Sequence, residues 1–115
     1  MDNEFNRNTY HLMEIKLSQI AARYLLCKEW LRKKEGKVCS GEKDTEVHFA
    51  TYVGRVEESY GKLEENQKLI VNNDFFFQNA YPYWWESYFA KSTYYRIKKS
   101  AMRKFLRKFR DAQIA

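Results

Sequence analysis

Residues 10–31 read YHLMEIKLSQIAARYLLCKEWL, and apolar side chains recur through this stretch at alternating intervals of three and four residues. Side chains at these intervals lie along one side of an α-helix. We therefore expect a helix over residues 9–35, with Asn8 as its N-cap and Gly36 at its end. The residues that keep the spacing are Tyr10, Met13, Leu17, Ile20, Tyr24, Cys27 and Leu31.

The apolar side of this helix is wider than the seam of a coiled coil. Ile15, Ala22 and Leu26 lie beside the seam, as a helix packed inside a bundle requires. Packing within the chain is therefore favoured, and a homodimer formed through the seam is the alternative.

A second apolar stripe follows a polar linker at residues 36–44. We expect its helix to begin at Asp44 or Thr45 and to break near Gly61, because Gly costs about 1 kcal/mol relative to Ala inside a helix. A short third helix is expected over residues 63–72. The stripe consists of Phe49, Val53, Val56, Tyr60 and Leu63.

An aromatic segment at residues 75–89 follows the turn-forming triplet at residues 72–74. Pro82 suits the first turn of a helix, so a short helix over residues 82–88 is expected. The aromatic side chains have two interpretations. They are either bulky anchors of a small core or a platform on which nucleic-acid bases stack.

The next residues predict a tight turn and a last helix. Ser92 or Thr93 is the expected N-cap of a helix over residues 93–111, which makes a helix-turn-helix with the preceding short helix. The chain has 115 residues but only 4 Gly and 1 Pro, too few turn formers for a sandwich or barrel. We therefore predict a small all-α bundle of four to five helices, with a hairpin at residues 1–59 for packing or dimerisation and a DNA-binding region at residues 60–115.

The positive charge of the chain gathers near its C-terminus. The net charge is +6, yet residues 1–89 carry −2 and residues 90–115 carry +8. Such an asymmetry favours a polyanionic partner, nucleic acid before an anionic membrane surface.

At 100° per residue, the last helix separates an apolar stripe from a basic face. The stripe holds Tyr94, Ile97, Ala101, Phe105 and Phe109, and the basic face holds Arg96, Lys99, Arg103, Arg107 and Arg110. Lys98, Lys104 and Lys108 project toward the apolar side. Either their ammonium groups reach back to solvent from its rim, or the helix extends past the body of the domain.

The second helix of a helix-turn-helix reads base edges with its N-terminal residues and contacts phosphates further along. Arginine can clamp guanine, lysine supplies a point donor, and a helix N-terminus can hold a phosphate. The alternatives are a solvated basic face, a helix lying on a membrane, and an interaction module whose basic helix binds an acidic protein partner. The candidate DNA-binding residues are Lys91, Ser92, Thr93, Tyr95, Arg96, Lys99, Ser100, Arg103 and Arg107.

The segment YFAKSTYYRIKKSAMRKFL at residues 88–106 resembles the ArpU and RinA group of phage transcriptional regulators, whose C-terminal halves are similar to region 4 of bacterial sigma factors. The resemblance covers roughly residues 60–110, and Leu63, Gln67 and Leu69 to Val71 look like the helix before a sigma-type helix-turn-helix. It implies a sequence-specific regulator of late genes in a phage or mobile element of Gram-positive bacteria, and it leaves open whether RNA polymerase is contacted. Only Glu86 matches the polar first helix usual in such motifs.

Other function classes find little support in the sequence. Two Cys and two His are scattered without a metal-binding spacing, so neither a zinc site nor another cofactor is expected. We find no Gly-rich phosphate loop and no paired nucleophile and base, so we do not expect an enzyme. The sequence shows neither a signal peptide nor a transmembrane run, so we expect a cytoplasmic protein, and the resemblance implies that the cell is a bacterial host.

Overall fold

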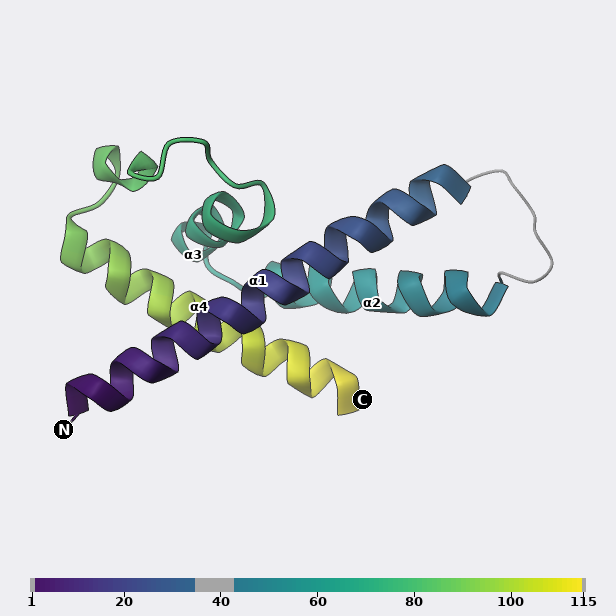
Figure 1. Cartoon of the computed structure of the whole chain (residues 1–115), viewed down its shortest axis with the longest axis horizontal. Helices are drawn as coiled ribbons and strands as arrows, with labels where there is room; N and C mark the ends of the chain where they lie inside the picture. Colours follow the sequence, from purple (N-terminus) through teal and green to yellow (C-terminus); the bar gives the residue numbers. More distant parts are fainter. Residues whose placement is uncertain (1, 35–42, 115) are drawn as a thin grey trace.

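The computed structural model describes residues 2–34 and 43–114, and all its regular secondary structure there is helical, which confirms the predicted all-α class (Figure 1). Three long helices carry the fold, and short helical segments fill the region between the second and the last. The elements are α1 (Asp2–Lys34), α2 (Lys43–Gly61), α3 (Glu65–Val71), the π-helix η1 (Asn72–Phe76), the 3-10 helix η2 (Trp84–Ser87) and α4 (Lys91–Ile114).

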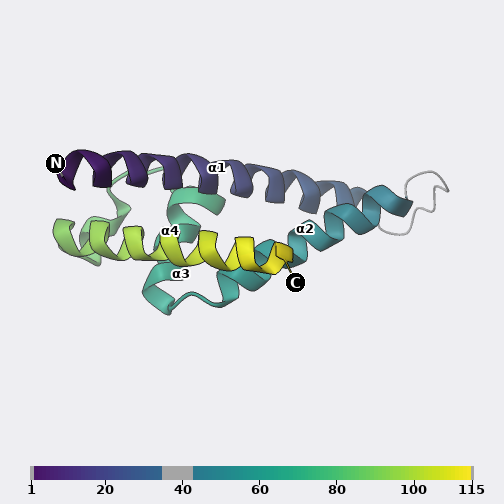
Figure 2. The same cartoon turned by 90° about the horizontal axis from the view of Figure 1, so that it is seen from below.

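The long helix α1 crosses α4, and α2 runs back from the far end of α1 toward that crossing (Figure 1). In the second view α4 lies between α1 on one side and α3 on the other (Figure 2). The main core fills the space between these helices. Its buried residues are Met13, Leu17, Ala21, Val56, Leu63, Val71, Phe75, Phe76, Ala101, Met102 and Phe105.

Residues of the α1 seam are therefore buried against other parts of the same chain. Leu17 is fully buried, Met13 and Cys27 are nearly so, and Tyr10 and Ile20 are half-buried against the same core. Burying a side chain such as Leu17 contributes about 1.5–3 kcal/mol to stability. The prediction that the seam packs within the chain is confirmed, and this burial disfavours the alternative homodimer.

The start of α1 differs from the prediction. Because the helix begins at Asp2, Asn8 lies inside it and is not its N-cap. Asparagine is only mildly unfavourable at an exposed helical position, so the helix passes through it. The predicted stop at Gly36, the linker up to residue 42 and Cys39 lie outside the described residues.

The turn predicted at residues 72–74 is wrong, because the chain continues there as a π-helix. Phe77 N–H donates to the Asn72 carbonyl at 2.9 Å, five residues back, and the Asn73 side chain donates to the Leu69 carbonyl at 2.8 Å. The wider turn brings both Phe75 and Phe76 into the core. Upstream, α2 ends at Gly61 as predicted, and α3 then starts with a capping box at Glu64.

The aromatic segment is divided between core and surface. Phe75, Phe76, Trp84 and Trp85 are buried, as the anchor interpretation predicts. The expected helix at 82–88 is shorter, a single 3-10 turn that holds the two tryptophans against the start of α4. There Trp85 stacks on Tyr94 with a centroid distance of 4.5 Å. The exposed aromatic residues of the segment are Phe77, Tyr81, Tyr83 and Tyr88.

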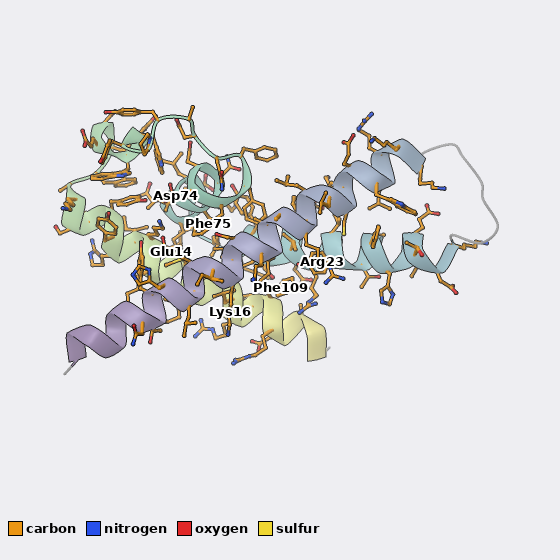
Figure 3. All side chains as sticks on the ribbon, viewed as in Figure 1. Glu14, Lys16, Arg23, Asp74, Phe75 and Phe109 are labelled. Atoms are coloured by element: carbon orange, nitrogen blue, oxygen red, sulfur yellow. The ribbon has the colours of Figure 1, made fainter. Side chains whose placement is uncertain are left out.

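Lys98 is buried, with 7% of its surface exposed, so neither interpretation offered for it is right. Its Nζ lies 3.1 Å from Glu14 of α1 and 3.3 Å from Asp74 of η1. Asp74 also accepts hydrogen bonds from Tyr94 at 2.5 Å and from Trp84 at 2.8 Å. These five side chains, named here the lysine cluster, join α1, η1, η2 and α4. Glu14 and Asp74 are labelled in Figure 3.

Burial opposes the positive charge on Lys98. The carboxylate of Asp74, together with the other acidic groups around it, outweighs that penalty and raises the pKa of Lys98 above its ordinary value. The pKa of Tyr94 is also raised, first by burial and then by the hydrogen bond to Asp74. Burial and a hydrogen bond to Glu57 raise the pKa of Tyr24 in the same way.

These shifts predict that the free energy of unfolding falls as the pH rises above about 10. The unfolded chain loses its tyrosine and lysine protons near pH 10, whereas the folded chain retains them, so alkali favours the unfolded state. Below about pH 9 both states keep these protons, so the contribution of the three groups to the free energy of unfolding does not vary with pH.

Urea-unfolding midpoints between pH 8 and pH 11 measure this effect. Tyr94→Phe is the matched variant, because it removes one of the titrating groups and should make the alkaline fall shallower. A midpoint that stays constant up to pH 11 would contradict the prediction.

Candidate nucleic-acid interface

The helix α4 begins earlier than the sequence predicts. Tyr94 N–H donates to the Ala90 carbonyl at 2.9 Å, which makes Ala90 the N-cap and places Ser92 and Thr93 inside the first turn. The prediction that Ser92 or Thr93 caps the helix is therefore wrong. The backbone N–H groups of this first turn remain without helical acceptors, as at any helix N-terminus.

A fixed turn leads into α4. The N–H groups of Tyr88 and Phe89 both donate to the Trp85 carbonyl at 2.9 Å, so the chain leaves η2 in one defined direction. Gln67 of α3 donates to Ser100 Oγ at 3.3 Å and attaches α3 to the same helix. The first half of α4 is thus held at two places, its entry turn and Ser100.

The buried side of α4 is broader than the five-residue stripe. Tyr94, Ala101 and Phe105 are buried as projected, and Met102 and Lys98 are buried as well. The half-buried side chains at its margins include Ile97, Phe109, Lys104 and Lys108. The two lysines at the margin fit the interpretation that their ammonium groups reach solvent from the rim.

Opposite this side, α4 presents the basic stripe, which we define as Arg96, Lys99, Arg103, Arg107 and Arg110. The four arginines are exposed and Lys99 is half-buried. The stripe spans about 21 Å along the helix, at 1.5 Å per residue. Within α4 the one acidic residue is Asp111, whose carboxylate lies 3.7 Å from Arg110.

The remaining candidate residues lie at the start and along the two edges of this surface. Lys91 and Ser92 are exposed in the first turn, and Thr93 is half-buried. Tyr95 marks the edge toward α1, where its ring contacts Tyr10 at a centroid distance of 6.3 Å.

Ser100 marks the edge toward α3, because its hydroxyl accepts the hydrogen bond from Gln67. The structure therefore brings Arg96, Lys99 and Arg103 together on the open face and places Tyr95 and Ser100 at its borders.

Sequence reasoning missed the cations that α1 and α2 bring to the far half of α4. Lys16 and Arg23 of α1 line the same groove as Arg103 and Arg107, and both are labelled near Phe109 in Figure 3. Arg55 of α2 donates from Nε to the Phe109 carbonyl at 3.0 Å. No local pattern marks these side chains, because helices distant in sequence bring them together.

Comparisons with family models, with curated proteins and with solved structures found no match to this chain. No group of three His, Cys, Asp or Glu side chains that could hold a metal ion forms within residues 2–34 and 43–114. In those same ranges, no helix combines the length and apolarity that a membrane crossing needs.

Proposed function

We propose that this chain is a sequence-specific binder of double-stranded DNA that regulates transcription, and that it controls late genes of a phage or mobile element. The single observation that carries the proposal is the basic stripe. A row of exposed cations lies on a helix whose opposite side is anchored in the core. The late-gene role rests on the resemblance of residues 88–106 to the ArpU and RinA regulators.

The dimensions of α4 suit the major groove. An α-helix with its side chains is about 10–12 Å wide, and the major groove of B-DNA is about 12 Å wide. In this arrangement Arg96 and Lys99 point to base edges, and the first-turn N–H groups with Ser92 hold a phosphate. Arg103 and Arg107 then lie further along the helix, where phosphates are contacted.

Arg96→Ala is expected to weaken binding to a preferred duplex by about 1–3 kcal/mol and to weaken binding to random duplex much less, because it removes a base contact. The preferred duplex comes from selection on a random pool, and both affinities are measured by gel-shift titration at a fixed moderate salt concentration.

The matched control for Arg96→Ala is Lys33→Ala, which removes an exposed charge from the end of α1. Equal losses on preferred and random duplexes would refute base reading by Arg96. A parent chain that retards no duplex would refute the proposal and favour an acidic protein as the partner of α4.

Arg107→Ala is expected to lower affinity for every duplex by a similar factor, because a phosphate contact carries no sequence information. Loss of one phosphate contact should reduce the slope of log affinity against log salt by about 1. An unchanged slope would place Arg107 outside the DNA contact.

A further inference from the structure

An open groove of about 850 Å³ lies between α1 and α4, with α2 at its end. Figure 1 shows where α1 crosses α4, and Figure 2 shows the two helices in separate layers. Among the side chains that the structure describes, six cationic ones line the groove and no Asp or Glu does. The six are Lys16, Arg23, Arg55, Arg103, Arg107 and Arg110.

Four of these cations are available to a ligand. Within residues 8–34 and 43–112, no carboxylate forms an ion pair with Lys16, Arg23, Arg103 or Arg107. The guanidinium of Arg23 lies 4.8 Å from the centre of the Tyr52 ring, on the groove wall. Stacking on an aromatic face restrains a guanidinium while its N–H edges stay free to bind carboxylates.

Apolar side chains also line the groove. Leu12 is 58% exposed there, and the half-buried side chains of Ile20 and Leu106 continue the apolar surface. A nucleic-acid backbone needs cations but gains little from exposed leucine side chains. An amphipathic helix with acidic residues beside its apolar face can pair with the cations and also pack on these apolar side chains.

We propose that this groove binds an acidic amphipathic helix of a partner protein. Its apolar face packs on Leu12, Ile20 and Leu106, and its carboxylates pair with Lys16 and Arg23 on one wall and with Arg103 and Arg107 on the other. From Leu12 to Arg23 the α1 wall is about 16 Å long, which matches three turns of a helix. A second copy of this chain is a poor occupant, because two chains of net charge +6 repel each other.

The groove shares Arg103 and Arg107 with the DNA-binding surface, and only its α1 wall lies outside that surface. The inference rests on the lining of the groove and not on the proposed function, and variants of the α1 residues Lys16, Arg23 and Leu12 test it selectively. All three side chains are exposed, so their replacement leaves the core intact.

The probe is a fluorescent ~18-residue peptide with leucines at helical i, i+3, i+4 and i+7 positions and glutamates elsewhere. The control peptide has the same composition with its leucines spread around the helix. By fluorescence anisotropy with the full chain, the amphipathic peptide should bind at least about tenfold more tightly than the control peptide. Equal binding of the two peptides would overturn the proposal.

Lys16→Glu with Arg23→Glu should weaken peptide binding by about tenfold or more, because two close charge pairs become repulsive. The matched control reverses Lys33 and Lys62, which are exposed outside the groove and should change the affinity by less than about threefold. The uncharged variant Leu12→Ser should weaken binding without altering the net charge. Similar losses in the control variant, or no loss with Leu12→Ser, would refute a specific groove.

Duplex DNA supplies the last arm of the experiment. The Lys16 and Arg23 double variant should bind the preferred duplex within about threefold of the control variant at Lys33 and Lys62, which has the same net charge, while its peptide affinity falls. If duplex binding falls as much as peptide binding, the groove belongs to the DNA surface and the proposal is wrong. If the parent chain binds no duplex yet the peptide results hold, only the proposed function fails.

Discussion

Lys98→Met is expected to lower the free energy of unfolding by about 3–5 kcal/mol, because it leaves Asp74 and Glu14 without the cation that neutralises them in the lysine cluster. Methionine preserves most of the volume among the surrounding rings, so the loss measures the charge and not a cavity. With a total stability of about 5–15 kcal/mol for a domain of this kind, the variant should lose at least a fifth of its free energy of unfolding. Urea unfolding followed by circular dichroism measures the change.

Lys99→Met is the matched control for Lys98→Met. Lys99 is the next residue along the helix, but it is only half-buried and belongs to the basic stripe. We expect a change within about 0.5 kcal/mol there. The double variant Lys98→Met with Asp74→Asn should recover part of the loss, since an amide can still accept a hydrogen bond from Trp84. A Lys98→Met variant as stable as the parent would show that the cluster does not hold the helices together.

Phe105→Ala should cost about 3–5 kcal/mol, because the phenyl ring is fully buried at the centre of the main core. Its ring lies 6.0 Å from that of Phe76 and 6.2 Å from that of Phe109. Removing it opens a cavity where α1, η1 and α4 meet, and those helices are fixed by other contacts and can collapse only partly.

Phe77→Ala supplies the same chemical change at the surface, where 67% of the side chain is exposed. Its effect should stay within about 0.5 kcal/mol of zero. The difference between the two variants in chemical unfolding therefore isolates burial. Equal effects at positions 77 and 105 would show that the core is placed wrongly.

The long helices could be predicted from sequence because their signal is local. The intervals from Tyr10 to Leu31 and from Tyr94 to Phe109 record which side of each helix is buried, and the structure buries those sides. The ends of the helices are harder to predict from the sequence. The N-caps proposed at Asn8 and Ser92 have suitable side chains, but the helices begin upstream of both.

The remaining features depend on contacts between distant residues. The burial of Lys98 could not be predicted, because its partner Glu14 lies 84 residues away in the sequence. The π-helix follows from the packing of both Phe75 and Phe76 in the core. The prediction of a turn at residues 72–74 used residue type alone and could not include that packing. For the candidate site, the basic stripe follows from helical projection, whereas the α1 wall of the groove needs the crossing of α1 and α4.

The contact between Glu14 and Lys98 also constrains how the protein is made. Translation at roughly 5–20 residues per second separates the emergence of these two side chains from the ribosome by about 4–17 s. The segments from α2 to η1 emerge during this interval, and the part of the apolar side of α1 that packs on α4 stays uncovered until α4 follows. A nascent chain stalled before α4 therefore exposes that part of α1 to chaperones and proteases.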